Sequence, residues 1–262
     1  WFDSGAMPFA QWHFPFENRD RVAQEVPADF IAEAVDQTRG WFYTLLAVST
    51  MYADKPAYRS VVSVDLVLDA KGKKMSKSKG NVVEPMGILA AHGADVVRWH
   101  LLTSRPIWQP MRFDEKDLVE VRNRVFGTLA STYQFFALYA NVDGFDGLEP
   151  EAGWRPKDVS DRWLLSSLER LVAEVTADLQ GYETSKAGKR LADFVVEDLS
   201  NWYVRRNRRR FWKGALGDDK RDAYRTLRHA LLVVSRLLAP FSPFLPDAIH
   251  RALLPGAAGA AG

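Results

Sequence analysis

The stretch Val61–Lys79, VVSVDLVLDAKGKKMSKSK, decides how the rest of the chain is interpreted. Its first part, Val61–Leu68, is rich in β-branched and apolar residues, which predicts a buried strand. Asp69–Gly72 supplies turn residues. A helix is predicted to begin near Glu84 and Pro85, because proline is tolerated in a first helical turn and an acid is favoured there. The basic segment between them is therefore predicted to lie on a loop between a strand and a helix.

This loop carries five lysines from Lys71 to Lys79, with serines and glycines among them. Ammonium groups and backbone amides are what a leaving pyrophosphate needs as negative charge develops on it. From charge alone, a solvated basic loop or a contact with nucleic acid is the more ordinary interpretation. The five residues Lys74–Ser78, KMSKS, form a far more specific pattern than the charge itself.

Composition sets the broad class of the protein. The chain has 262 residues, 47% of them hydrophobic, a formal net charge of +2 and no cysteine. These values predict a globular protein of about two domains, without disulfides or thiolate zinc sites, and fit a reducing compartment. We expect no membrane span, since the apolar runs are short and interrupted by charge. The sequence begins at Trp1 without a methionine, so we expect it to be a fragment.

A second cluster of polar residues follows another predicted strand, Pro27–Ala32. Glu33, Asp36 and Gln37 lie between that strand and a predicted helix over Trp41–Tyr52. Ligands of parallel α/β sheets bind where strands end and helices begin, so these three residues are a candidate site. Each of them taken singly is better explained as a helix cap or a surface residue, and it is the three within five residues that make a site an equally good interpretation.

The segment before this strand, Trp1–Asn18, is rich in aromatic residues and prolines and is predicted to be irregular. Because it is too apolar to be free in solvent, it is expected either to pack as a loop under a domain or to form an apolar pocket wall.

Alternating strands and helices predict an α/β fold with a parallel doubly wound sheet over residues 1–113, of which about half is present. From Asp114 the apolar residues recur at helical spacing, which predicts an antiparallel helical bundle over residues 114–255. Ser160 is a candidate cap of the second helix of this bundle. The tail, residues 256–262, contains only Gly and Ala and is predicted to be disordered.

One bundle segment, Asn201–Trp212, is dense in arginine. Arg205, Arg208, Arg209 and Trp212 share one helix face at spacings of three, four and seven residues. Guanidinium groups pair with phosphates and tryptophan offers a stacking surface, so this face is a candidate RNA-binding surface. Alternatively, the arginines pair with acids such as Glu197, Asp218 and Asp219.

Taken together, these motifs resemble the isoleucyl-tRNA synthetases, a family of class I aminoacyl-tRNA synthetases. Lys74–Ser78 matches the second signature of the class without substitution. Asp36–Phe42 is similar to the Asp-Gln-x-Arg-Gly-Trp-Phe stretch that separates this family from its valyl and leucyl relatives. Trp1–Gly5 resembles the segment that re-enters the catalytic domain after the editing insertion, and Asn201–Trp212 resembles part of the helical anticodon-binding domain. The resemblance covers nearly the whole chain.

The resemblance implies the second half of a Rossmann-like nucleotide-binding fold followed by the anticodon-binding helices. It implies an isoleucine–tRNA ligase of the cytoplasm that uses isoleucine, tRNA(Ile) and ATP with Mg²⁺ as substrates, with no protein-bound metal. Lys77 and Lys74 would be catalytic and would contact ATP with Ser76 and Met75. The aminoacyl-adenylate would be bound by Glu33, Asp36, Gln37, Trp41 and Trp1. The tRNA would be bound by Arg205, Arg208, Arg209 and Trp212.

The chain also departs from the family pattern. The His-Ile-Gly-His signature, the editing domain and the C-terminal extension are absent from these 262 residues. We therefore expect the isolated chain neither to activate isoleucine nor to edit. A non-catalytic tRNA-binding paralogue stays open as an alternative. A valyl-type class I synthetase is a third interpretation, against which the residues of Asp36–Phe42 argue.

Overall fold

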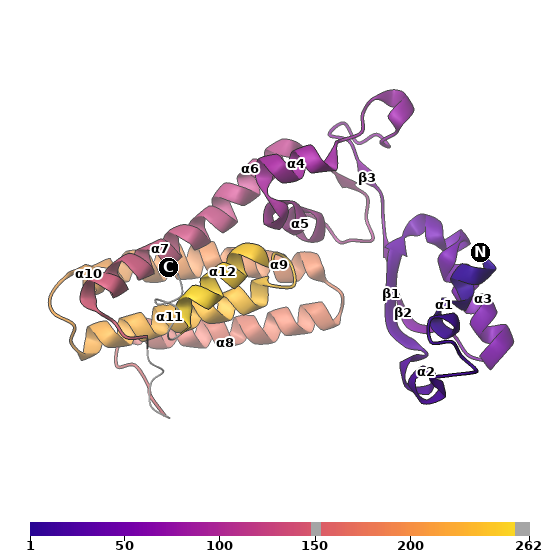
Figure 1. Cartoon of the computed structure of the whole chain (residues 1–262). Coiled ribbons are helices and arrows are strands. Elements are labelled where there is room, and N and C mark those ends of the chain that lie inside the picture. Colours follow the sequence, from indigo (N-terminus) through magenta and orange to yellow (C-terminus); the bar gives the residue numbers. More distant parts are fainter. Residues whose placement is uncertain (148–152, 255–262) are drawn as a thin grey trace, which may run out of the picture. The chain divides into compact units, whose positions relative to one another are not determined.

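The computed structural model describes residues 1–147 and 153–254 and divides the chain into two compact units (Figure 1). The first unit comprises Trp1–Gly80 and Ile107–Arg112, and the second comprises Asn81–Pro106 and Phe113–Gly262. Residues 81–106, which the sequence assigned to the first domain, thus pack with the helical unit. The predicted functional boundary at residue 113 stays a prediction, and the predicted disordered tail lies outside the described residues.

The first unit alternates helices and strands. Its elements are α1 (Phe2–Ala10), α2 (Arg19–Glu25), β1 (Ala28–Ala34), α3 (Trp41–Ala53), β2 (Tyr58–Val64), β3 (Val67–Leu68) and β4 (Met111–Arg112), with single 3₁₀ segments at Val35–Arg39 and Lys77–Lys79. Strands β1 and β2 are parallel, with Ala28 opposite Tyr58 and Ala34 opposite Val64. Since α3 connects them in the chain, this is a βαβ unit, as the alternation predicted.

The prediction that Val61–Leu68 forms one buried strand is wrong in detail. Strand β2 begins at Tyr58 and ends at Val64, and the separate strand β3 pairs in parallel with β4. Val61 is 42% exposed and Val67 is 39% exposed. A parallel strand is buried when neighbouring strands pair with both its edges and helices cover both its faces. Among the described residues, β2 pairs with one strand, β1.

The prediction of an irregular Trp1–Asn18 is also wrong, since Phe2–Ala10 forms helix α1 with Pro8 inside it. Helix α1 packs closely on α3: a Cβ atom at Gly5 would lie 2.6 Å from the Thr44 carbonyl oxygen. Tertiary packing has therefore overridden the local proline signal. The expectation that this aromatic segment is covered holds for Phe9, which is buried, but not for Phe2 and Phe16, which are 69% and 80% exposed.

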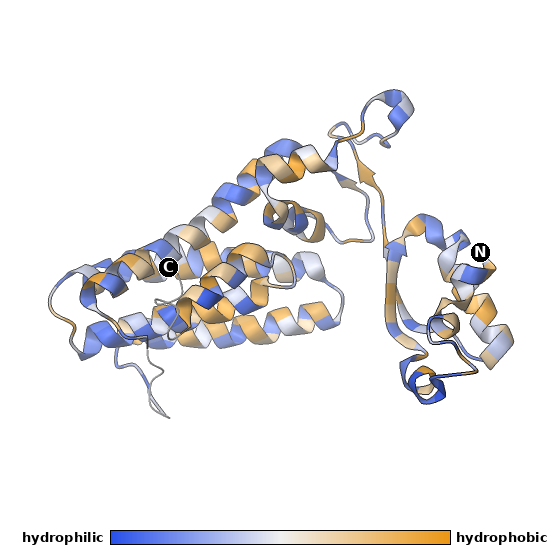
Figure 2. Cartoon of the chain, viewed as in Figure 1, coloured by the Kyte–Doolittle hydropathy of each residue, from blue (hydrophilic) through white to orange (hydrophobic). Residues whose placement is uncertain are grey.

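The second unit is helical in the residues described, apart from loops, as the 3.6-residue periodicity predicted. Its helices are α4 (Pro85–His92), α5 (Ala94–Thr103), α6 (Glu115–Val121), α7 (Thr128–Asp143), α8 (Val159–Gln180), α9 (Thr184–Asp193), α10 (Arg205–Trp212), α11 (Asp218–Leu238) and α12 (Phe244–Leu253). The π-helical segments Arg122–Gly127 and Phe194–Val204 join α6 to α7 and α9 to α10. Figure 2 shows hydrophobic and hydrophilic residues alternating along α8 and α11, the pattern of helices that bury one face.

The core of the second unit lies where α8, α9 and α11 meet. Its fully buried leucines and valines include Leu164, Leu168, Leu191, Leu227 and Leu231. The cap of α8 differs from the predicted one: the Asp158 carboxylate, rather than Ser160, accepts the hydrogen bond, from the Ser160 N–H at 2.7 Å. An N-cap side chain must precede the helix to reach its free amides, and Ser160 already lies within α8.

Helix α5 explains why residues 81–106 belong with the bundle. The Asp95 carboxylate accepts hydrogen bonds from the Phe244 and Leu245 amides at the start of α12, at 3.0 and 2.6 Å. The indole of Trp99 packs against the rings of Phe126 and Phe241. The contacts with Phe241, Phe244 and Leu245 join α5 to the C-terminal part of the chain across more than 140 residues of sequence. No helix in the described ranges is long and apolar enough to cross a membrane.

Candidate functional site

The strand-end residues lie where the sequence predicted, and one of them has a structural role. Glu33 is the penultimate residue of β1, opposite Ser63, while Asp36 and Gln37 belong to the following 3₁₀ segment. Gln37 Oε1 accepts a hydrogen bond from the Trp41 backbone N–H at 2.8 Å. Gln37 thus satisfies a free amide at the start of α3 and leaves its Nε2, 3.4 Å from Asp36 Oδ2, as a donor.

Trp1, Gln37 and Trp41 meet around Gly40. A Cβ atom at Gly40 would lie 2.6 Å from Gln37 Oε1 and 3.0 Å from the ring of Trp1, so only glycine allows this approach. Trp41 is half-buried, and its Nε1 donates to the Ser4 carbonyl oxygen at 3.1 Å. Trp1 is 71% exposed. The structure therefore brings two indoles and an amide to the carboxyl end of β1, where Glu33 and Asp36 are also exposed.

The KMSKS loop is built as predicted, on a turn that follows a strand. The Asp69 carboxylate accepts hydrogen bonds from the amides of Lys71 and Lys73 at 3.0 and 2.8 Å. Gly72 has a φ of 76°, which favours glycine. Lys74 then returns to form an antiparallel bridge with Leu68 of β3. Helix α4 follows with Pro85 in its first turn and with Glu84 as its cap, which confirms the predicted helix start.

Beyond that bridge the loop projects its cationic residues into solvent. Lys77–Lys79 form one 3₁₀ turn, closed by Gly80 at a φ of 63°. The Ser76 and Ser78 hydroxyls lie 3.2 Å apart. Lys77 is exposed, and no ion pair to it occurs among the described residues. Figure 2 shows this part of the loop as strongly hydrophilic.

Sequence reasoning missed one basic residue beside the loop. Arg112, on β4, pairs with Leu68 of β3. Its Nε would lie 3.1 Å from a Cβ atom built on Gly72, so the guanidinium lies against the turn that precedes KMSKS. A two-residue strand this far along the chain carries no periodic signal in the sequence, which is why it was missed.

The arginine face of α10 is mostly unpaired. Arg205, Arg208 and Arg209 are exposed, Trp212 is 57% exposed, and none of the three arginines forms an ion pair with a described residue. Arg208 lies over the ring of Phe135, with 5.8 Å from its Cζ to the ring centroid. The alternative interpretation, pairing with nearby acids, applies instead to Arg210.

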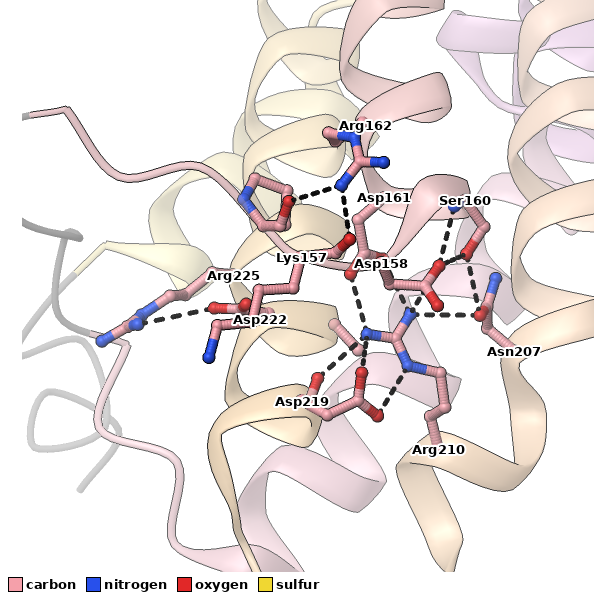
Figure 3. Close-up of polar contacts among 12 residues, drawn as sticks. Lys157, Asp158, Ser160, Asp161, Arg162, Asn207, Arg210, Asp219, Asp222 and Arg225 are labelled. Carbon is pink, nitrogen blue, oxygen red and sulfur yellow. Dashed lines mark hydrogen bonds and ion pairs between the residues drawn. The ribbon is translucent and has the colours of Figure 1, made fainter.

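Arg210 is the centre of a partly buried network at the start of α8 (Figure 3). Its Nη2 lies 2.7 Å from Asp161 Oδ2 and 2.8 Å from Asp219 Oδ1, and Asp161 is fully buried. Burial lowers the pKa of Arg210, but its hydrogen bonds with Asp161 and Asp219 outweigh burial and raise that pKa. Arg210 thus fixes α10 against the first turns of α8 and α11.

Tyr203 completes this network from the preceding π-helical segment. Its hydroxyl donates to Asp161 Oδ1 at 2.6 Å. Burial, followed by the charge of Asp161, raises the pKa of Tyr203 well above its usual value, so the hydroxyl stays a donor. Arg210 and Tyr203 thus both hold the helix that carries the exposed arginines against Asp161 of α8.

Two family models match the chain. The model described as tRNA synthetases class I (I, L, M and V) matches residues 1–114. The model described as the anticodon-binding domain of tRNA ligase matches residues 161–259. The first match contains the strand-end cluster and the KMSKS loop, and the second contains the arginine face of α10.

Solved structures show the same fold. A methionyl-tRNA synthetase from Mycobacterium tuberculosis in complex with methionyl-adenylate has a TM-score of 0.76 at 21% identity, over 92% of this chain and 47% of that one. The LeuRS–tRNA–LeuAMS ternary complex from Agrobacterium radiobacter K84 has a TM-score of 0.75 at 18% identity, over 96% of this chain and 30% of that one. The fold is therefore that of class I synthetases, a Rossmann-like part followed by a helical domain.

The sequence relatives are more specific. Isoleucine–tRNA ligase of Porphyromonas gingivalis is 53% identical over 255 residues, which cover 97% of this chain and 22% of that protein. The ligases of Cytophaga hutchinsonii and Clostridium novyi are 52% and 48% identical, with 23% and 24% of their lengths covered. The chain thus spans less than a quarter of the relatives it matches. By these matches the chain is homologous, over nearly its whole length, to a segment of the isoleucine–tRNA ligases, and it carries class I synthetase and anticodon-binding domains.

Proposed function

We propose that this chain contributes to the ATP-dependent activation of isoleucine and its transfer to tRNA(Ile). The observation that carries the proposal is 53% identity to an isoleucine–tRNA ligase over 97% of the chain, with the KMSKS residues unsubstituted. We propose that the reaction takes place in the cytoplasm, a reducing compartment, which suits a chain without cysteine.

In the first step a carboxylate oxygen of isoleucine attacks the α-phosphate of ATP, which enters with Mg²⁺. The bond to the β-phosphate breaks, pyrophosphate leaves, and isoleucyl-adenylate forms. In the second step a hydroxyl of the terminal tRNA ribose attacks the adenylate carbonyl, and AMP leaves. The enzyme forms no covalent intermediate, so its contribution is to position the reactants and to stabilise charge.

Lys77 and Lys74 are proposed to stabilise the charge that develops on pyrophosphate, with Ser76 and Met75 shaping the loop around ATP. The support for this role is geometric: Lys77 is exposed on a turn bounded by Gly72 and Gly80, both at positive φ. An exposed ammonium on such a loop can meet the phosphates mainly when the loop closes. Contacts made mainly in the closed form stabilise the transition state more than bound ATP.

The strand-end cluster is proposed to hold the isoleucyl part of the adenylate. Trp1 and Trp41 would flank the branched side chain, since the Trp1 ring lies against Gly40, where no side chain fits, and Trp41 is the next residue. Glu33, Asp36 and the Nε2 of Gln37 would bind the amino and ribose groups. The amide oxygen of Gln37 is already used by the Trp41 N–H, so Gln37 acts here only as a donor.

The helical unit is proposed to bind tRNA through Arg205, Arg208, Arg209 and Trp212. Their unpaired guanidiniums are suited to phosphates, and an exposed indole is suited to stacking on a base. A second candidate function is tRNA binding without catalysis. The helical unit alone would be sufficient for it. That candidate is favoured by one observation: the exposed arginines and Trp212 all lie in the helical unit, which contains none of the KMSKS residues.

A chimera tests the proposal. The 262 residues would replace the matching segment of the Porphyromonas gingivalis ligase, and isoleucine-dependent ATP–pyrophosphate exchange would be measured with isoleucine and with valine. We expect exchange that favours isoleucine, and no exchange from the isolated chain. A folded chimera that binds tRNA(Ile) but supports no exchange would favour the tRNA-binding candidate, and a preference for valine would favour a valyl-type enzyme.

A further inference from the structure

A hollow of about 260 Å³ opens between helix α7 and the helix formed by η4 (Phe194–Val204) and α10. It lies wholly within the second unit, with polar side chains on both walls and cationic side chains on the wall formed by η4 and α10. The residues that matter here are Ser131, Thr132 and Phe135 from α7, and Asn201, Arg205 and Arg208 from the opposite wall.

Thr132 is the most unusual residue of this hollow. Its side chain is 2% exposed, and its hydroxyl has no hydrogen-bond partner among the described residues. Buried hydroxyls are normally satisfied, because an unpaired one keeps its desolvation penalty. A buried donor that lines a hollow and lacks a protein partner points to a ligand that supplies an acceptor.

The charge of the hollow indicates what that acceptor is. Arg205 and Arg208 line it, both are exposed, and neither forms an ion pair with a described residue. An acid on the same helix, Glu197, is not among the lining residues, and its carboxylate accepts a hydrogen bond from the side-chain amide of Asn201 at 3.1 Å. Two guanidiniums and hydroxyl donors, with the neighbouring carboxylate engaged, are suited to an oxyanion.

We propose that this hollow binds one phosphate group of an RNA backbone, a proposal that rests on the tRNA binding proposed above. Arg205 and Arg208 hold the phosphate from one side, and the hydroxyls of Thr132 and Ser131 donate to it from the other. Phe135, which lies under the Arg208 guanidinium at 5.8 Å, holds that group over the hollow. Arg209 and Trp212 lie outside the hollow and contact other parts of the RNA.

Salt dependence tests whether the two arginines share one phosphate. Binding of tRNA(Ile) to the full 262-residue chain would be measured at several salt concentrations for Arg205→Gln, Arg208→Gln and the double variant. Each phosphate contact that is lost reduces the magnitude of the slope of log K against log salt by about one. We expect each single variant to leave the slope nearly unchanged and the double variant to reduce its magnitude by about one. A loss of about one from each and about two from both would overturn the proposal.

Thr132→Val tests the buried hydroxyl, since valine keeps the shape and removes the donor. We expect roughly ten-fold weaker tRNA binding, the effect of losing one hydrogen bond to a charged group. Thr226→Val is the matched control. The Thr226 hydroxyl on α11 is also buried and without a hydrogen-bond partner among the described residues, but Thr226 does not line the hollow. Removing that hydroxyl should leave tRNA binding unchanged.

The outcomes separate this proposal from the function on which it rests. One outcome is that the unmodified chain binds tRNA(Ile) in a salt-dependent way and that Thr132→Val binds it equally well. That outcome would overturn the proposed phosphate site, while tRNA binding by the chain would stand. Failure of the unmodified, folded chain to bind tRNA at all would overturn both. Folding of each variant would be checked by its thermal unfolding, and the two valine variants are expected to be equally folded.

Discussion

The indole Nε1 of Trp41 donates a hydrogen bond to the carbonyl oxygen of Ser4, at 3.1 Å. In an uninterrupted helix that carbonyl would accept from the amide four residues later, but residue 8 is a proline and has no N–H. Trp41 therefore supplies the donor that Pro8 removes from α1. A residue proposed to select the substrate side chain also holds the N-terminal helix in place.

Two substitutions of Trp41 separate these roles. Phenylalanine keeps most of the apolar area but lacks the donor, so Trp41→Phe should lower the free energy of unfolding by about 1 kcal/mol. Alanine removes the area as well, and in the chimera Trp41→Ala should raise the KM for isoleucine by the equivalent of about 1–3 kcal/mol. The KM for ATP should change little. If Trp41→Ala leaves the isoleucine KM unchanged, Trp41 is structural only.

Arg210 is expected to act on stability where its neighbours act on binding. Arg210→Gln leaves the buried carboxylate of Asp161 without its cation, which should lower the free energy of unfolding of the helical unit by about 3–5 kcal/mol. Arg209→Gln, on an exposed and unpaired arginine, should stay within about 0.5 kcal/mol. Denaturant unfolding measures both values, and equal effects would contradict the role assigned to Arg210.

His100 should make the helical unit less stable in mild acid. Burial lowers the pKa of His100 from its usual 6.5, an effect that the charge of Asp117 partly offsets. The unfolded chain then binds a proton at a higher pH than the folded chain does. The contribution of neutral His100 to the free energy of unfolding is therefore fully present above the pKa that His100 has in the unfolded chain. It is lost as pH falls through that pKa, by at most about 1.4 kcal/mol per pH unit.

The variant His100→Asn provides the comparison, because its amide can still meet the Ser104 hydroxyl, which lies 2.9 Å from His100 Nδ1. Between pH 7.5 and 5.5 we expect the variant to lose less stability than the unmodified chain. The other histidines are common to both proteins, so they cancel from the difference. Parallel pH profiles for the two proteins would exclude His100 as the cause.

The sequence predicted those features that short-range patterns encode. The turn at Asp69–Gly72, the helix start at Glu84 and Pro85, and the helices of the bundle all follow from local residue preferences and periodicity, and the structure confirms them. The candidate residues Glu33, Asp36 and Gln37 were placed at a strand end by the same reasoning, whereas Trp41 became a candidate only through the family resemblance. Their roles in binding stay predictions.

Features set by distant contacts were missed. Helix α1 forms despite Pro8 because α3 packs against it at Gly5 and Trp41 satisfies Ser4. The pairing of Arg210 with Asp161 joins residues 49 positions apart, and nothing local distinguishes Arg210 from the arginines beside it. The position of Arg112 beside Gly72 depends likewise on the pairing of β3 with β4. Periodicity reports which face a residue is on, but not which residue it meets.

The most direct test of the account is the pre-steady-state rate of isoleucyl-adenylate formation in the chimera with Lys77→Ala. If Lys77 meets the phosphates mainly as pyrophosphate leaves, the rate should fall by roughly 10²–10³ while ATP affinity changes much less. Lys79→Ala, on the same turn but outside the KMSKS residues, should have a far smaller effect. A loss of ATP affinity as large as the loss of rate would contradict the account, since Lys77 would then bind ATP in the ground state.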